Sequence, residues 1–266
     1  ESPEATWLAR FQLGSAFRDE LASTPVIAVL HLVDGLTHEE VAAEVYDEFK
    51  PAIERVWEDG VATLRSDLRE WLSRTAKDVE WEPAFFELAF GLTSKPREEQ
   101  DPRSVPTPVT LVEGLRLRGS IDLVERHVSG SLRATDYKTG RVKADAEAVI
   151  GGGRHLQPVL YSLVLEQLFP GVKIWGGRLY YTTYVGGFTE RPVLLDGVSR
   201  EAFGSVARTI RESLATGFFP AMPEEGSCTW CDHRAVCGPD EERRVVQSRK
   251  NMKPELIPLR TLRDQP

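Results

Sequence analysis

Cysteine is scarce in this sequence: three cysteines occur among 266 residues, and all of them lie between positions 228 and 237. An odd and clustered set is not typical of the disulfide framework of a secreted domain. It favours a reducing, cytoplasmic environment and a metal site.

Long hydrophobic runs are absent as well. No apolar stretch approaches the roughly 20 residues that a transmembrane helix needs, so we expect no membrane partner. We expect no secretory signal peptide within the given residues, although residue 1 need not be the natural start, because the opening letters ESPEATWLAR are typical of the middle of a longer chain. Hydrophobic residues make up 41% of the chain and charged residues 28%, which indicates a soluble globular protein with a hydrophobic core.

Two catalytic motifs are also missing. The chain has no G-x-x-x-x-G-K-[ST] loop for ATP hydrolysis and no G-x-S-x-G nucleophile turn. The glycines of IGGGRH, at positions 150–155, lack the spacing of a dinucleotide site, and we interpret them as a mobile connecting loop near DNA.

Positive charge is in the minority, because the net charge is −8, which argues against a general polyanion binder. Residues 116–154 differ from the rest: they hold eight Lys or Arg and five Asp or Glu, so this segment carries +3 and the remainder −11. A nucleic-acid groove on an acidic body is therefore allowed, although charge alone does not establish it.

Hydrophobic periodicity predicts helices and strands along the chain. We expect helices at 155–169, at 199–217 and twice within 37–76, where Thr37 and Glu40 form a capping box and Pro51 begins the second helix. In the helix at 199–217, Ser199 is the expected N-cap and Gly217 the expected stop. Strands are expected at 85–92, at 172–184, and three times within 111–141 with turns at Glu113–Gly114 and Ser129–Gly130. This order predicts an α/β fold in which helices flank a mixed sheet.

The segment LRATDYKTGR, at positions 132–141, places an acid and a lysine on one strand face. If Val128–Ser129–Gly130 forms a three-residue hairpin loop with Gly130 in the left-handed region, Asp122 lies directly opposite Asp136. A two-residue loop would put the two acids on opposite faces. We therefore predict the three-residue loop, with Lys138 on the same face as both acids.

Two adjacent carboxylates repel unless a proton or a cation separates them, and oxygen ligands of this kind suit Mg²⁺ or Mn²⁺. Lys138 is then placed to hold an attacking water or to neutralise charge on a phosphate oxygen. Glu87, amid apolar neighbours on another strand, is a candidate third carboxylate. The alternative is a surface salt bridge of little energetic value.

The ordered set FFELAFGL, LRGSIDLV, DYKTG, LQPVLY and CTWCDHRAVCG resembles the RecB-type nucleases of the PD-(D/E)xK superfamily. The resemblance covers roughly residues 85–238 and is most similar to the nuclease domain of AddB-like helicase-nuclease subunits. It implies a restriction-endonuclease-like core that cleaves DNA with a divalent metal. Asp122 and Asp136 would be metal ligands, Lys138 the catalytic lysine and Glu87 a further acidic ligand.

Gln157 and Tyr161 match the helix residues that shape the site or touch DNA in that family, although packing of the helix on the sheet is an alternative role. The resemblance implies one compact domain in three parts. These are a helical part at 1–80, the catalytic core at 81–220, and a cysteine-bearing segment with the C-terminal tail at 221–266.

One position departs from the family pattern, which carries an early histidine as G-x-x-x-H. Here Gly14 is followed by Arg18, which pairs with phosphates or carboxylates but does not bind a metal. His31 and His38 are possible substitutes, although the apolar surroundings of His31 favour a core histidine.

The cysteines form C-x-x-C-x₅-C, at Cys228, Cys231 and Cys237, a spacing that indicates metal ligation. The resemblance implies a [4Fe-4S] cluster that takes a fourth, upstream cysteine, which this chain lacks. His233, a residue before position 1 or a non-protein ligand are possible fourth ligands. Zn²⁺ is the alternative metal.

Three functions therefore compete. The first is the exonuclease domain of a DNA repair and recombination helicase-nuclease, with DNA and an AddA-like helicase subunit as partners. The second is a stand-alone or CRISPR-associated RecB-like single-strand nuclease. The third is a catalytically impaired DNA-binding or scaffold domain, which Arg18 favours and the acid–lysine set opposes.

Overall fold

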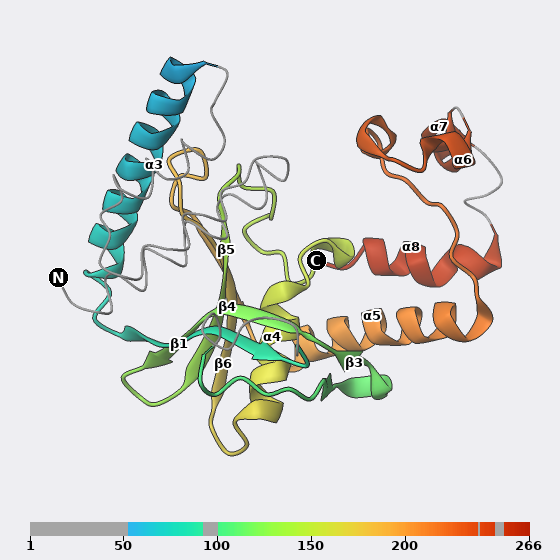
Figure 1. Ribbon diagram of the computed structural model, residues 1–266. Helices are drawn as coiled ribbons and strands as arrows, with labels where there is room; N and C mark the ends of the chain where they lie inside the picture. The colour runs from blue at the N-terminus through green and yellow to red at the C-terminus, as the bar shows by residue number, and fades with distance from the viewer. Residues whose placement is uncertain (1–52, 93–100, 239, 248–252) are drawn as a thin grey trace.

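Five strands form the central sheet of the computed structural model, which describes residues 53–92, 101–238, 240–247 and 253–266 (Figure 1). In spatial order they are β1 (Trp81–Phe90), β4 (Gly119–His127), β5 (Leu132–Lys138), β6 (Ile174–Tyr181) and β7 (Glu190–Leu194). Neighbouring strands are antiparallel except for β5 and β6, which are parallel. The sheet is therefore mixed, which confirms the predicted α/β class.

Helices cover both faces of this sheet. Trp71 of α3 (Glu54–Thr75) packs against Tyr137 and Tyr180, which point to one face. Leu163 and neighbouring residues of α4 (Gln157–Leu168) pack against Ala134 on the other face. Because side chains alternate along a strand, even-numbered positions of β5 face α4 and odd-numbered positions face α3.

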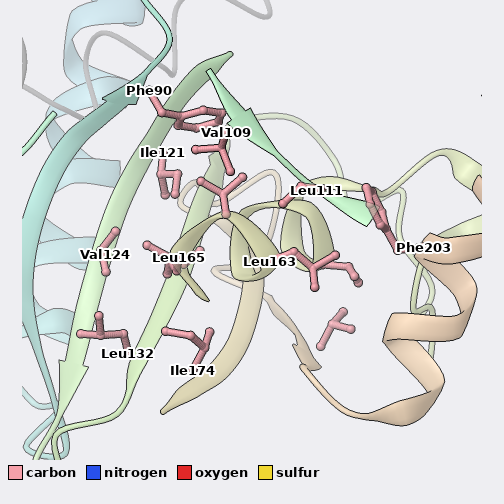
Figure 2. Close-up of a cluster of buried hydrophobic side chains, with 14 of the residues drawn as sticks. Phe90, Val109, Leu111, Ile121, Val124, Leu132, Leu163, Leu165, Ile174 and Phe203 are labelled. Atoms are coloured by element: carbon pink, nitrogen blue, oxygen red, sulfur yellow. The ribbon is translucent and has the colours of Figure 1, made fainter. Parts of the chain in front are cut away.

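The larger core lies between the sheet and the helices α4 and α5 (Gly197–Thr216), as Figure 2 shows. Ile121, Leu165 and Phe203 are almost completely buried there and join three separate elements. Burial of large apolar side chains of this kind contributes about 1.5–3 kcal/mol each, so this core fixes α4 over the sheet.

A short hairpin lies beside the main sheet. Its strands are β2 (Val109–Thr110) and β3 (Arg116–Leu117), joined through the 3₁₀ turn η3 (Val112–Gly114). Glu113 and Gly114 both have positive φ, 57° and 72°, as tight hairpin turns require. This confirms the predicted turn at Glu113–Gly114.

The loop of three glycines before α4 is held by the C-terminal residues. The 3₁₀ turn η4 (Gly151–Gly153) has φ values of 53°, 64° and 91°, a conformation that glycine adopts without steric strain. The amides of Ile150 and Gly151 donate to the carbonyl of Pro266, at 2.7 and 3.1 Å, and that of Gly152 donates to Gln265. These bonds fix the approach of the chain to α4.

The remaining elements follow α5. They are η5 (Ser227–Trp230), α6 (Arg234–Cys237), α7 (Glu241–Gln247), η7 (Pro254–Leu256) and α8 (Ile257–Arg263). Within the part of the chain that the structure describes, no helix is both long and apolar enough to cross a bilayer.

One local prediction was wrong, and one strand was not predicted. The N-cap of α5 is Asp196, whose carboxylate accepts from the amide of Ser199, while the Ser199 hydroxyl accepts from the amide of Asp196. Ser199 is thus the third residue of a capping box and not the cap. Strand β7 was not predicted, because its sequence, ERPVL, lacks regular alternation of polar and apolar residues.

The stop of α5 at Gly217 is confirmed, with φ of 66° in the left-handed region. The predicted helix that begins near Thr37, and Pro51, lie outside the described residues. The division into three parts stays a prediction.

Candidate active site

The hairpin of β4 and β5 has the predicted register. Leu123 pairs with Thr135 and Arg126 with Leu132, so one step further Asp122 lies opposite Asp136. The amide of His127 donates to the carbonyl of Ser131 at 2.8 Å, and Gly130 has φ of 85°, which closes the three-residue loop. One Asp122 carboxylate oxygen accepts from the amide of Tyr137 at 2.9 Å, directly beside Asp136.

Glu87 lies on β1, which pairs with the edge of β4 that β5 does not occupy, and it is opposite Asp122. Phe86 pairs with Leu123 and Leu88 with Ile121, so the same register assigns Glu87 to Asp122. Three carboxylates thus follow one another across β1, β4 and β5.

The alternation of side chains breaks at this pair. Phe86 and Leu123 pack with Trp71 on the α3 face, whereas Leu88 and Ile121 pack with the α4 core. In a regular strand Phe86 and Leu88 would point to the same face, but here they point to opposite faces. The backbone of Glu87, between them, makes this possible by adopting a positive φ of 46°. A left-handed non-glycine residue costs roughly 1–2 kcal/mol. The strain is located beside the candidate catalytic residues, as is common in functional sites.

The environment of Asp122 disfavours its negative charge. Burial, and next the negative charge of Asp136, raise the pKa of Asp122 well above its ordinary value. The hydrogen bond from the Tyr137 amide and the charge of Lys138 oppose this shift without cancelling it. The site therefore gains stability when a proton or a cation reduces the charge of this pair.

Lys138 projects from the same face as Asp136. Its Nζ lies 2.7 Å from Oδ2 of Asp136, and the Lys138 side chain is 27% exposed whereas that of Asp136 is 8% exposed. The ammonium group is thus at the border between the buried Asp136 and solvent. From there it can reach a phosphate or a water molecule that enters the site.

Helix α4 brings Gln157 and Tyr161 to this face, one helical turn apart. Burial, followed by the charges of Asp136, Asp122 and Glu87, raises the pKa of Tyr161 far above its ordinary value. Tyr161 therefore carries a neutral phenol, which can donate a hydrogen bond to an anion.

A glycine of β6 permits the close approach of α4. A Cβ atom at Gly177 would lie 2.3 Å from the carbonyl oxygen of Pro158, the second residue of the helix. The Ser162 hydroxyl donates to that same carbonyl at 2.6 Å. The first turn of α4 is therefore fixed on the sheet, and Gln157 and Tyr161 with it.

A pocket of about 400 Å³ lies between α4 and the β3–β4 segment. Its lining includes Gln157 and Tyr161, an apolar part that contains Phe90, and the two arginines Arg118 and Arg154. Arg154 forms an ion pair with Glu224 at 2.9 Å. Sequence reasoning did not select these arginines, although both belong to the positively charged segment 116–154. The pocket joins positive charge to the helix face that borders the carboxylates.

A second polar cluster occupies the opposite face of the sheet. Glu125 accepts from Arg133 at 2.8 Å and from Arg178 at 2.9 Å, and all three side chains are at least 93% buried. This network was not predicted, because Arg178 is 53 residues from Glu125 and only the parallel pairing of β5 and β6 brings them together. Asp78, 3.4 Å from Arg133, and Glu190, 2.5 Å from Arg178, supply further negative charge at its border, and the network is a structural element of the core.

The early-motif residues Gly14 and Arg18, and the substitutes His31 and His38, lie outside the described residues. Their roles stay predictions.

The three cysteines are free thiols on the surface of the C-terminal segment. Cys231 is exposed and Cys228 and Cys237 are half-buried, and the amide of Cys228 donates to Glu242. Over residues 53–92, 101–238, 240–247 and 253–266, no three His, Cys, Asp or Glu side chains gather as a metal-ligand group. The thiols as they stand therefore do not form the predicted iron–sulfur ligand set.

Asp122 and Asp136, unlike the cysteines, are arranged in a way that suits a divalent metal ion. Mg²⁺ keeps several water ligands and usually takes one or two protein carboxylates, so it does not require three protein ligands. Asp122 and Asp136 are adjacent and mutually repulsive, Asp136 is buried and Asp122 is half-buried, and a cation between them relieves that repulsion. The donor set therefore fits Mg²⁺ or Mn²⁺.

Comparison with known proteins agrees with this geometry. Residues 8–238 match the family described as the PD-(D/E)XK nuclease superfamily. The chain is 32% identical over 150 residues to the CRISPR-associated exonuclease Cas4/endonuclease Cas1 fusion of Myxococcus xanthus (strain DK1622). This match covers 55% of this chain and 25% of that protein. It is 29% identical over 129 residues to the Gene 69 protein of Mycobacterium phage D29, covering 47% of this chain and 44% of that one. The chain thus spans less than half the length of these two relatives.

Proposed function

Since this chain belongs to the PD-(D/E)XK nuclease superfamily, we propose that it hydrolyses the phosphodiester bonds of DNA as an exonuclease and that it depends on Mg²⁺ or Mn²⁺. The observation that carries the proposal is the alignment of Asp122 with the buried Asp136, with Lys138 within 2.7 Å of Asp136. Fold stability does not require such a charged arrangement, and replacement by apolar residues is often neutral or stabilising.

Asp122 and Asp136 would hold the metal, with Glu87 as a further oxygen ligand. When bound, a divalent cation supplies positive charge that activates water and stabilises a phosphate in the transition state.

The other residues position the substrate. Lys138 donates to a phosphate oxygen or holds the attacking water, since its ammonium group lies between the acids and solvent. Tyr161 and Gln157 donate hydrogen bonds to the DNA strand, and Arg118 neutralises a phosphate along the adjoining pocket.

The test is a nuclease assay on end-labelled single-stranded and duplex DNA in Mg²⁺ or Mn²⁺. Lys138→Ala and Asp136→Ala should each lower the cleavage rate at least about 100-fold, because each removes charge stabilisation at the reacting phosphate. Lys173→Ala is the matched control, since Lys173 is exposed just before β6, at the opposite end of the sheet from Lys138.

Full metal-dependent activity in both variants would contradict the assigned site. Covalently closed single-stranded circles should resist cleavage, and rapid cutting of circles would identify an endonuclease. A wild-type protein that binds DNA but does not cut it under any of these conditions would support the impaired-scaffold alternative.

Two biological settings are consistent with this activity. The name of the Myxococcus relative, a CRISPR-associated exonuclease fusion, favours the CRISPR-associated alternative, for which we propose trimming of single-stranded ends. A helicase-nuclease in DNA repair and recombination rests on the AddB-like sequence pattern. In that setting, adding an AddA-like helicase subunit with ATP should stimulate degradation of blunt duplex DNA, whereas a stand-alone nuclease should show no stimulation.

The cysteines carry a separate proposal, that Cys228, Cys231 and Cys237 bind a [4Fe-4S] cluster once a fourth ligand is supplied. Its support is their spacing and their free, accessible thiols. Anaerobically purified protein should absorb visible light at about 400 nm. Stoichiometric zinc without this absorption would assign Zn²⁺ instead.

A further inference from the structure

We infer that a groove between α3 and the loop at 182–189 binds single-stranded DNA on its way to the carboxylates, an inference that rests on the proposed function. The groove has a volume of about 410 Å³ and is lined by Ala62, Arg65, Ser66, Arg69, Glu70 and Tyr184. We call it the α3 groove. It is separate from the pocket beside α4.

The chemistry of the α3 groove suits a single strand. Arg65 and Arg69 are one helical turn apart on α3 and face the same groove as the ring of Tyr184, which is 60% exposed. Val185, beside it in the loop, is 61% exposed. Guanidinium groups neutralise phosphates, and an exposed aromatic ring stacks on a base of any sequence.

The acidic residue of the groove does not cancel this charge. Glu70 forms an ion pair with Arg74 at 2.7 Å, so its carboxylate is already balanced. Arg69 is exposed, and within the described parts of the chain it forms no ion pair. On a chain of net charge −8, the α3 groove is therefore a local site of positive charge that attracts a polyanion.

The fold holds Tyr184 in place before any ligand arrives. Its amide donates to Oδ1 of Asp67 at 2.9 Å, and Asp67 is a buried residue of α3. The Tyr184 ring packs edge-on against Phe188 at 5.1 Å, and the guanidinium of Arg74 lies 4.7 Å from the Phe188 ring. A ring that is already ordered loses little conformational entropy on binding a base.

The same loop is bound to the strand that carries the catalytic lysine. The amide of Thr182 donates to the carbonyl of Lys138 at 2.9 Å, and the Thr183 hydroxyl donates to the carbonyl of Thr139 at 2.7 Å. Tyr184 follows Thr182 by two residues, a span of about 7 Å along extended chain.

The α3 groove and the acids lie on opposite faces of the sheet, because α3 packs on the Tyr137 face and Asp136 points to the α4 face. A strand bound in the groove therefore passes over the ends of β5 and β6, beside Lys138, to reach the acids. A glycine lets the loop pack closely at this crossing: a Cβ at Gly186 would lie 3.0 Å from the carbonyl oxygen of Gly140.

The experiment measures the affinity for a fluorescent oligo-dT strand in EDTA, so that binding is observed without cleavage. Tyr184→Ala should weaken binding roughly 5- to 150-fold, the range for loss of one stacked base, while Tyr184→Phe should bind like wild type. Arg65→Ala and Arg69→Ala should each lower the slope of log affinity against log salt by about 0.7.

Arg55→Ala is the matched control. Arg55 is exposed on the same helix, but it lies 14 residues before Arg69, which corresponds to about 21 Å along the axis. It should leave both the affinity and the salt slope unchanged.

Cleavage kinetics separate the groove from the catalytic site. On a long single strand, Tyr184→Ala and Arg69→Ala should raise KM at least about fivefold and leave kcat within about twofold, because the groove binds DNA away from the reacting bond. A trinucleotide, too short to span the acids and the groove, should be cut equally by both variants and wild type.

The inference would be overturned if Tyr184→Ala, Arg65→Ala and Arg69→Ala all bound DNA with the affinity and salt slope of wild type. It would also be overturned if an acidic peptide competed for the groove more tightly than DNA of the same charge. Failure of the proposed function gives a different result. In that case Lys138→Ala would retain full activity while the groove variants still lose affinity for DNA.

Discussion

The replacement Asp122→Asn should make the protein more stable in the absence of metal and inactive in its presence. Residues directly opposite in an antiparallel pair have Cβ atoms about 5 Å apart, and at an effective dielectric of about 20 two unit charges at that distance repel by ~3 kcal/mol. Lys138, at 2.7 Å from Asp136, offsets part of this repulsion. The amide oxygen of asparagine can still accept from the amide of Tyr137.

We therefore expect Asp122→Asn to gain about 1–3 kcal/mol in the free energy of unfolding at pH 8 in EDTA. For a chain of this size that corresponds to a rise in Tm of roughly 2–12 °C.

The gain should depend on pH with a definite sign. The pKa of Asp122 is raised in the folded protein, so the folded state holds a proton that the unfolded state has released. Wild-type stability therefore falls as pH rises from about 3.9, the ordinary value for aspartate, through the raised folded value. The variant lacks this group, so the difference between the two proteins should vanish below about pH 4 and be largest in alkaline solution.

Metal provides the second half of the test. Mg²⁺ at 100 times its Kd should stabilise the wild-type protein by about 2.7 kcal/mol, and Asp122→Asn should gain much less because it has lost a ligand. Urea denaturation with and without Mg²⁺ measures both effects, with Asp145→Asn, an exposed acid, as the control. A variant that is less stable than wild type in EDTA at pH 8, or one that Mg²⁺ stabilises as much as wild type, would refute the reasoning.

Two further predictions concern the scaffold of the site. Glu125→Gln should cost about 3–5 kcal/mol, because it removes the buried counter-charge that Arg133 and Arg178 share and leaves them only the more exposed Asp78 and Glu190. Burial alone would raise the pKa of Glu125, but Arg178 and then Arg133 hold it below its ordinary value. The stability that Glu125 contributes is therefore lost as pH falls, and the difference in unfolding free energy between wild type and variant should narrow below about pH 4. A difference that is constant between pH 3 and pH 7 in urea denaturation would contradict this. Gly177→Ala should cost about 1–3 kcal/mol and lower kcat/KM, since the new Cβ displaces the first turn of α4 and with it Tyr161. Gly60→Ala in α3, where a Cβ meets no atom within 4 Å, should instead stabilise the protein by about 0.5–1 kcal/mol. If Gly177→Ala and Gly60→Ala had equal effects on activity, α4 would not have moved.

The sequence by itself determined the features that depend on neighbouring residues. Gly130 and the odd loop length set the register that aligns Asp122 with Asp136, because only that parity keeps both acids on one face. Gly217 ends α5 for a similarly local reason, its freedom to adopt positive φ. The cap of the same helix was assigned wrongly, because Asp196 and Ser199 are both good capping residues and only the backbone conformation distinguishes them.

Tertiary structure alone decided the features that join distant segments. The left-handed conformation of Glu87, the Glu125–Arg178 pair and the contact of Asp67 with Tyr184 each depend on strand order and helix docking. No periodicity records such contacts, since they arise between residues that are far apart in the chain and are stabilised only after the sheet has formed. The acid–lysine set could thus be found in the sequence, whereas the strained strand beside it and the positively charged groove leading to it required the fold.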